Sequence, residues 1–207
     1  LCACAREQFE AGERFDLTGN WPWTLSCGSA AQSFDVSVPS TVAGALCEAG
    51  YFGEDLFVGR NYEAIDKSPF DDSWTYTTTF EGQPAGNGHT ELVFDGLNYY
   101  ADIFLNGTQI ASADTTAGVF IRRAYDVTDL LKGNNKLEVK LRRAQKGDLN
   151  HGYVDWNPRP LDESMGIVRP VTLHTTGALS IEDVFVIPDL DTEHFETADL
   201  TVRITLR

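Results

Sequence analysis

Short stretches in which apolar and polar residues alternate run along most of the chain, and a period of two is typical of half-buried β-strands. The clearest stretch is 136–141, where Leu137, Val139 and Leu141 would point inward. Asn106-Gly107 is a strong signal for a two-residue hairpin turn. The predicted strands are 74–80, 91–95, 101–105, 109–111, 136–141, 168–175 and 184–187.

A helical pattern is limited to residues 41–49, where we expect Ser40 to cap the first turn and Gly50 to end the helix. Residues 126–131 would add a single turn. Many short strands separated by turns, with almost no helix, predict an all-β fold. A jelly-roll β-sandwich suits the length of 207 residues.

The pattern changes near Gly177, where a further strand leads into an acidic stretch and then into alternating residues 198–206. We therefore expect three parts. Residues 1–12 would be a leader remnant or a flexible N-terminus, 13–180 the jelly-roll domain, and 181–207 the start of a truncated second sandwich.

The net charge of the chain limits which classes of binding partner are expected. Lys and Arg total 16 against 31 Asp and Glu, which gives a formal net charge of −15. Nucleic acids and anionic membranes both favour clustered basic residues, so neither is an expected partner. The sequence has no run of about 18 apolar residues, so we expect no membrane span.

The four cysteines are too few and too badly spaced for a disulfide scaffold or a zinc site. Cys27 and Cys47 could be paired, but two separate buried thiols are the favoured reading. Leu1-Cys2-Ala3-Cys4 resembles the end of a secretory leader, or a lipoprotein box with Cys4 acylated, and the alternative is an arbitrarily cut terminus. We therefore expect a secreted, periplasmic or cell-surface protein.

We expect no metal and no cofactor, because the four histidines are scattered and no phosphate loop or dinucleotide-binding fingerprint is present. Asp189, Asp191 and Glu193 could hold Ca²⁺, but a solvated linker is favoured. Asn106-Gly107-Thr108 is formally a glycosylation sequon, although the hairpin turn already explains it. His151 could touch a ligand or be solvated.

Residues 147–170 form a long connection between two predicted strands and are rich in aromatic, amide, carboxylate and guanidinium groups. Within it, Asp155, Trp156 and Asn157 offer what a sugar site needs. An indole packs on the apolar face of a pyranose, a carboxylate binds hydroxyls or an ammonium, and an amide both donates and accepts. The alternative is that Trp156 belongs to the core and Asp155 caps a turn.

The sequence resembles the N-terminal domain of glycoside hydrolase family 2, especially its exo-β-D-glucosaminidase and β-mannosidase branch. The most specific motif is Asp155-Trp156-Asn157-Pro158 followed by Met165-Gly166-Ile167. Two positions depart from the family: Val168 stands where a tryptophan is frequent, and Arg159-Pro160 could redirect the loop. The other matching pieces are 17–21, 38–42, 74–80, 94–98, 102–107 and 125–131.

The resemblance implies a jelly-roll sugar-binding-type domain, then an immunoglobulin-like domain and a (β/α)₈ barrel that carries the two glutamates of a retaining hydrolase. It implies that Asp155, Trp156 and Asn157 form one wall of the terminal-sugar subsite and that Asn98 lies at its edge. The partners would then be a glucosamine- or mannose-containing glycan and the catalytic barrel. Asn98 as a turn amide after Gly96 is the alternative.

Three functions follow from these observations. The first is an accessory domain of a retaining exo-β-glycosidase, inactive alone because the catalytic glutamates lie elsewhere. The second is a free-standing carbohydrate-binding module without hydrolase activity. The third is a structural spacer whose loop only packs on the core.

Overall fold

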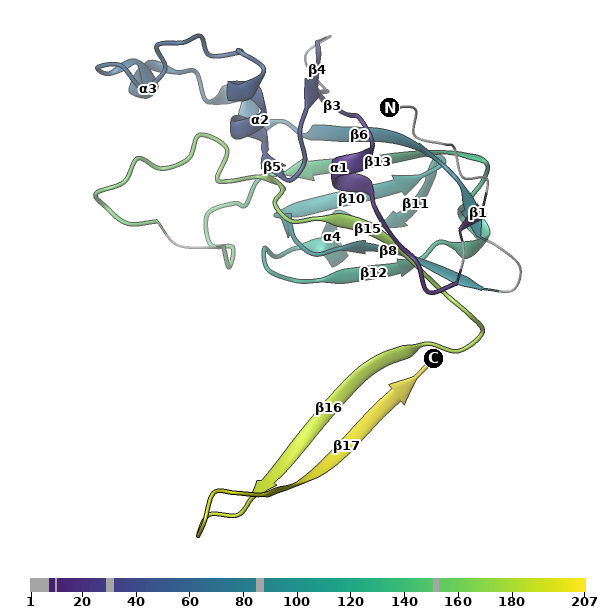
Figure 1. Cartoon of the computed structure of the whole chain (residues 1–207). Coiled ribbons are helices and arrows are strands. Elements are labelled where there is room, and N and C mark those ends of the chain that lie inside the picture. The colour runs from purple at the N-terminus through teal and green to yellow at the C-terminus, as the bar shows by residue number, and fades with distance from the viewer. Residues whose placement is uncertain (1–7, 10, 29–31, 85–87, 151–152) are drawn as a thin grey trace.

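The computed structural model describes residues 8–9, 11–28, 32–84, 88–150 and 153–207. Two facing β-sheets form the body of the domain, as Figure 1 shows. Within the described ranges, the larger sheet has six antiparallel strands in the order β11-β10-β13-β6-β3-β4, and the facing sheet has four in the order β12-β8-β15-β2. The predicted all-β sandwich is confirmed.

The strands of the six-stranded sheet are β3 (Trp23–Cys27), β4 (Ser33–Val36), β6 (Trp74–Glu81), β10 (Tyr100–Leu105), β11 (Thr108–Ala111) and β13 (Asn134–Arg142). Those of the four-stranded sheet are β2 (Arg14–Asp16), β8 (His89–Phe94), β12 (Arg123–Asp126) and β15 (Val171–Thr176). A small third sheet joins β5 (Ser40–Thr41), β14 (Gly166–Ile167) and β9 (Leu97–Asn98). Strand β1 (Gln8–Phe9) pairs in parallel with β7 (Gln83–Pro84).

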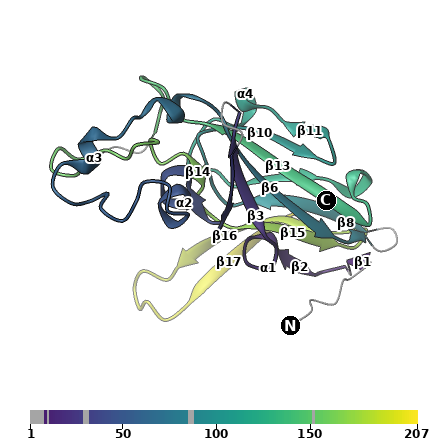
Figure 2. The same cartoon turned by 90° about the horizontal axis from the view of Figure 1, so that it is seen from above.

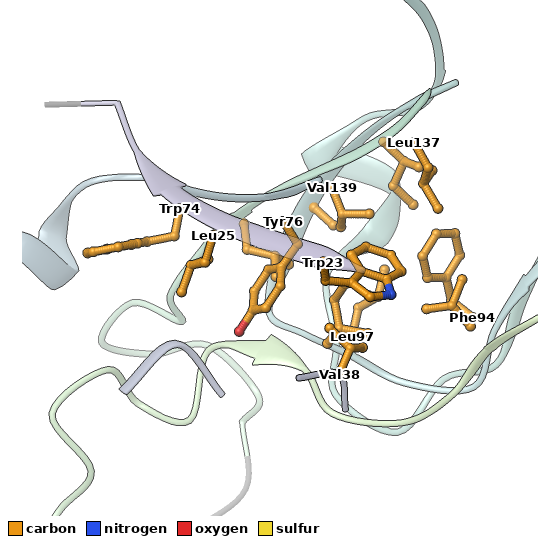
Figure 3. Packing of buried hydrophobic residues seen from close by; sticks show 14 of the residues in the cluster. Trp23, Leu25, Val38, Trp74, Tyr76, Phe94, Leu97, Leu137 and Val139 are labelled. Atoms are coloured by element: carbon orange, nitrogen blue, oxygen red, sulfur yellow. The ribbon is translucent and has the colours of Figure 1, made fainter. Parts of the chain in front are cut away.

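The core lies between the two large sheets, and the alternation along β13 explains how it forms. Leu137, Val139 and Leu141 are fully buried, as predicted, because every second side chain of a strand points to the same face. They belong to one core cluster with large aromatic side chains of the same sheet, including Trp23 on β3 and Tyr76 on β6 (Figure 3). The Trp23 indole N–H donates to the carbonyl oxygen of Leu17 at 2.8 Å, so its polar atom is satisfied inside the core.

The predicted helix is α2 (Val42–Glu48), and Gly50 follows it with φ +75°. The expectation for its cap was wrong by one residue. The Thr41 hydroxyl accepts from the Gly44 N–H, whereas the Ser40 hydroxyl donates backward to the Ser37 carbonyl. The other short helical elements are α1 (Leu17–Asn20), α3 (Asn61–Ala64), η1 (Ser68–Asp71), α4 (Ala113–Thr116) and η2 (Thr128–Leu130). No helix in the described residues is long and apolar enough to cross a membrane.

Two other local predictions are confirmed or corrected. Asn106 and Gly107 form the β10–β11 turn with φ of 52° and 83°, and the Asn106 amide donates to Leu130 and Asn135. The strand predicted over 168–175 begins three residues late: β14 ends at Ile167, before the predicted start, and β15 runs from Val171 to Thr176. Pro170, which lacks an N–H, lies in the gap.

The cysteine prediction is partly wrong. Cys27 is buried at the end of β3, but Cys47 is exposed on α2, and no disulfide joins them. Only Cys27 therefore fits the expectation of a buried thiol. Cys2 and Cys4 lie outside the described residues.

Strands β16 (Ile181–Leu190) and β17 (Ala198–Leu206) form a separate antiparallel hairpin that extends away from the sandwich (Figure 1). At its base, the Arg207 guanidinium lies 2.6 Å from the Glu91 carboxylate and 3.4 Å from that of Asp126. These two ion pairs join the hairpin to the four-stranded sheet, since Glu91 is on β8 and Asp126 on β12.

Candidate functional site

The long loop 143–165 leaves the sandwich between β13 and β14, and we call it the β13–β14 loop. It extends from the same end of the sandwich as residues 49–67, the segment that carries α3 between α2 and η1. Figures 1 and 2 show the two segments side by side in both views. They are joined by a hydrogen bond of 2.7 Å from the Tyr62 hydroxyl to the Arg159 carbonyl oxygen.

Asp162 fastens the C-terminal part of this loop to the start of α2. Its side chain is fully buried, one oxygen accepts from the Ala43 N–H at 2.7 Å, and the other accepts from the Ser164 N–H at 2.9 Å. Burial raises the pKa of this carboxyl, although the two N–H donors act in the opposite direction. Asp162 therefore has a structural role.

Asn98 holds the same part of the loop from the opposite side. It is fully buried on β9, and its amide nitrogen donates to the carbonyl oxygens of Glu163 at 3.1 Å and Ser164 at 2.8 Å. Those two residues have φ of 54° and 58°, so their carbonyls lie in a left-handed turn that Asn98 satisfies. In this chain, Asn98 supports the base of the loop and is not exposed to solvent.

At the base of the β13–β14 loop, the backbone of β14 also passes very close to that of β5. Gly166 on β14 pairs with Thr41 and with Asn98, and a Cβ at Gly166 would lie 2.2 Å from the Ser40 carbonyl oxygen. Only glycine fits at this crossing. The glycine of the Met-Gly-Ile motif therefore has a direct physical reason.

The middle of the loop is folded back on itself. The Arg159 guanidinium makes two hydrogen bonds to the Glu163 carboxylate, at 2.7 and 2.9 Å, and lies 5.1 Å from the centre of the Tyr153 ring. The Tyr153 hydroxyl donates to the Ser164 hydroxyl oxygen at 3.3 Å. These contacts hold together the part of the loop next to its tip. Arg159 therefore stabilises the loop, and its positive charge is paired with Glu163.

The tip is a turn, closed by a hydrogen bond from the Asn157 N–H to the Val154 carbonyl at 3.2 Å. It presents Asp155, Trp156 and Asn157 to solvent, and 82% of Trp156 is exposed. Trp156 is therefore not part of this chain's core. The structure brings these three residues together and places Asn98 apart from them, at the base.

A hollow of about 520 Å³ separates the tip from the α3 segment. Its far side is formed by Phe57 and Tyr62, which the sequence reading did not single out because they stand in an irregular segment with no periodic pattern. Asp162 was also missed, although Asp-x-Ser is a signal for a side chain that binds the N–H two residues ahead. The residues that line the hollow are Phe57, Gly59, Tyr62, Glu63, Lys67 and 155–159.

The other residues that the sequence offered for metal or ligand binding are the acidic turn around Asp191 and His151. Asp191 accepts from the N–H groups of Glu193 and His194, which lowers its pKa and explains this acidic turn. The described ranges contain no group of three His, Cys, Asp or Glu side chains that could hold a metal ion. His151 lies outside the described residues.

Comparison with known proteins identifies the family. The family model described as glycosyl hydrolase 2 galactose-binding domain-like matches residues 23–156. An exo-β-D-glucosaminidase of Hypocrea jecorina is 37% identical over 153 residues, which cover 73% of this chain and 17% of that protein. A β-mannosidase of Rattus norvegicus is 30% identical over 149 residues, covering 70% of this chain and 16% of that protein.

Solved structures agree with the sequence relatives. The exo-chitosanase of Amycolatopsis orientalis superimposes with a TM-score of 0.83 at 26% identity, over 95% of this chain and 24% of that one. A β-D-mannosidase from Dictyoglomus thermophilum has the same fold, with a TM-score of 0.71. The chain spans less than a fifth of the curated relatives quoted above. It belongs to the galactose-binding-like domain family of glycoside hydrolase family 2, and it resembles the N-terminal domain of exo-β-D-glucosaminidases and β-mannosidases.

Proposed function

We propose that this chain is the accessory domain of a retaining exo-β-glycosidase and that the loop tip contributes one wall of the terminal-sugar subsite. The observation that carries the proposal is the exposure of Trp156 beside Asp155 on a loop whose base is fixed by buried groups. A large indole exposed on a braced turn is a surface that a ligand can cover.

Each tip residue has a role in this proposal. The Trp156 ring would pack on the apolar C–H face of the terminal pyranose. The Asp155 carboxylate would accept hydrogen bonds from sugar hydroxyls, or pair with the 2-ammonium of glucosamine. Asn157 would hold the turn, as its backbone N–H does here, and offer its amide to a hydroxyl. Asn98 would act indirectly, by positioning the loop.

Glucosaminides are the favoured substrates, with mannosides second. The exo-β-D-glucosaminidases among the relatives are 32–38% identical to this chain, and the enzymes named for mannosides are 30–31% identical. A net charge of −15 also suits a cationic amino sugar, through long-range attraction.

The hydrolytic step belongs to another part of the protein. Retention requires two carboxyl groups about 5 Å apart across one sugar, and the family resemblance assigns them to glutamates of a barrel domain. The chain alone would therefore be inactive, and the barrel would be its partner. A free-standing binding module would differ by binding sugar in a protein that hydrolyses none.

The test uses the full-length protein and compares nitrophenyl β-glucosaminide with nitrophenyl β-mannoside. We expect the wild type to prefer the glucosaminide, and Asp155→Asn to lower kcat/KM on it by at least about tenfold, the scale of one lost charge-assisted hydrogen bond. The loss on the neutral mannoside should be smaller, because it carries no ammonium.

The matched control is Asp129→Asn. Asp129 is an exposed aspartate on η2, near the β10–β11 turn and therefore at the opposite end of β10 from the start of the β13–β14 loop. The Asp129→Asn variant should leave kcat/KM unchanged on both the glucosaminide and the mannoside. Unchanged kinetics in Asp155→Asn and Asp155→Ala, with the fold intact, would remove the tip from the substrate site.

We assign residues 181–207 to the start of an immunoglobulin-like domain, 13–180 to the jelly-roll domain, and 1–12 to a leader remnant or a flexible N-terminus. Cross-strand partners share a face, and one face of the hairpin is entirely apolar. The other face is mostly polar, so the hairpin has the two-sided character of a sheet that is covered on one side. The partner pairs of the apolar face are Val184–Ile204, Val186–Val202, Pro188–Leu200 and Leu190–Ala198.

The location of the protein is assigned from sequence alone. Leu1-Cys2-Ala3-Cys4 supports a secreted, periplasmic or cell-surface enzyme, with Cys4 as the lipid-bearing residue in a lipoprotein.

A further inference from the structure

A stacked pair of aromatic rings, exposed Phe57 and half-buried Tyr62, faces the loop tip across the hollow. Phe57 and Tyr62 have ring centres 5.9 Å apart and planes inclined by 18°. One face of Phe57 rests on Tyr62, yet 77% of the residue is exposed. Phe57 lies outside the buried core cluster, so most of its ring is open to a ligand.

The position of the pair is fixed. The Tyr62 hydroxyl donates to the Arg159 carbonyl at 2.7 Å, which ties the α3 segment to the β13–β14 loop. On the same segment, the Asn61 amide donates to the backbone and side-chain oxygens of Asp55 at 2.9 and 3.0 Å. The rings are therefore held in place before any ligand arrives.

Phe57, Tyr62, Asp155 and Trp156 line one hollow of about 520 Å³. This volume lies within the range of small-ligand sites, roughly 300–1,000 Å³. Phe57, Tyr62 and Trp156 give the hollow three aromatic side chains. Charged groups of Asp155, Glu63 and Lys67 line it as well. Aromatic surfaces beside polar groups match a pyranose ring, which has apolar faces and a hydroxylated circumference.

We propose that Phe57, supported by Tyr62, binds the second sugar ring of a β-linked oligosaccharide whose terminal ring lies against Trp156. The inference rests on the proposed function and extends it from a terminal-sugar wall to a subsite for the leaving part of the chain. A sugar polymer that passes Trp156 enters the same hollow with its next ring, because the hollow is continuous from Trp156 to Phe57.

The subsite predicts selectivity for substrate length. Methyl β-glucosaminide has a leaving group too small to reach Phe57, whereas a β-1,4-linked glucosamine trimer places a second ring in the hollow. Phe57→Ala in the full-length protein should lower kcat/KM on the trimer by about tenfold, as expected for one lost aromatic contact. On the methyl glycoside it should change kcat/KM by less than about twofold.

Two further variants separate stacking from other effects. Phe57→Tyr keeps a ring and should retain most of the trimer activity. Phe195→Ala removes the side chain of a residue that is 69% exposed at the β16–β17 turn. This variant should leave kcat/KM unchanged on both substrates. If the wild type prefers mannosides, the manno-configured trimer and methyl glycoside replace this pair.

Three results would overturn the inference. One is an unchanged rate on the trimer in Phe57→Ala. Another is an equal loss on both substrates, which would show that Phe57 supports the fold or contacts another domain. If the wild type hydrolyses neither substrate, the proposed function fails by itself. Calorimetric binding of the trimer then decides the subsite: about tenfold weaker binding in Phe57→Ala supports it, and equal or absent binding overturns it.

Discussion

The base and the tip of the β13–β14 loop place the same side-chain types in opposite environments. At the base, Asp162 and Asn98 are fully buried and bind backbone groups. At the tip, Asp155 and Asn157 are exposed in a turn. Burial and the nearby backbone groups therefore decide whether an aspartate or an asparagine holds the fold or stays open to solvent.

The arrangement has a simple physical logic. A binding loop must keep its tip in one place without using the tip's own polar groups, because those must remain available to the ligand. Here the anchoring groups come from the C-terminal part of the loop and from β9. The expected effects on stability should accordingly fall steeply from base to tip.

Among the residues of the β13–β14 loop and its anchors, the largest effect is expected for Asp162→Ala. The change removes the acceptor of two backbone N–H groups at a buried site, and we expect it to lower the free energy of unfolding by about 3 kcal/mol. Denaturant unfolding of the chain, monitored by tryptophan fluorescence, measures this loss.

Asp66→Ala is the matched control for Asp162→Ala. Asp66 also accepts from the N–H two residues ahead, that of Ser68 at 2.9 Å, but it lies at the surface, where water replaces the lost contact. We expect it to cost about 0.5 kcal/mol. Equal losses in the two variants would contradict the contrast between buried and exposed aspartates.

The sequence predicted the fold well where local rules and burial agree. The alternation of Leu137, Val139 and Leu141 predicted which face of β13 is buried, and Asn106-Gly107 predicted the β10–β11 turn, because both depend on residues close in sequence. The cap of α2 was misplaced by one residue, since Ser40 and Thr41 are both good caps. The backbone decides between them.

The sequence singled out residues for the candidate site but did not show how they are arranged. The sequence showed that Asp155 and Trp156 suit a sugar, yet it could not show that Trp156 is exposed, because a tryptophan is as suited to a core. The roles of Asp162, Asn98 and Tyr62 depend on contacts with residues 43, 163 and 159, so they follow from the tertiary structure. Phe57 became a candidate only through its neighbours.

An intermediate effect is expected for Asn98→Ala. The Glu163 and Ser164 carbonyls lose their donor, but the change also removes the Asn98 side-chain oxygen, which is buried without a hydrogen-bond partner among the described residues. We expect a loss of about 1.5 kcal/mol. Chemical denaturation measures it.

Asn98→Asp tests the same contact with almost no change in shape. It replaces the amide donor by a carboxyl that faces two carbonyl oxygens, so it should destabilise the chain more than alanine does. A milder effect of aspartate than of alanine would show that the amide donor does not hold the loop.

The smallest effect on stability is expected for Trp156→Ala, and this variant tests the comparison most sharply. Because 82% of Trp156 is exposed, its removal should change the free energy of unfolding by less than about 0.5 kcal/mol. Trp74→Ala is the buried reference: Trp74 is 2% exposed, and its loss should cost about 4 kcal/mol.

In the full-length enzyme, Trp156→Ala should still lower kcat/KM by about tenfold, because the indole acts only when sugar covers it. If Trp156 serves binding and not folding, kcat/KM falls while the free energy of unfolding stays the same. A loss of more than about 1 kcal/mol in the free energy of unfolding would show that Trp156 is part of the structural base.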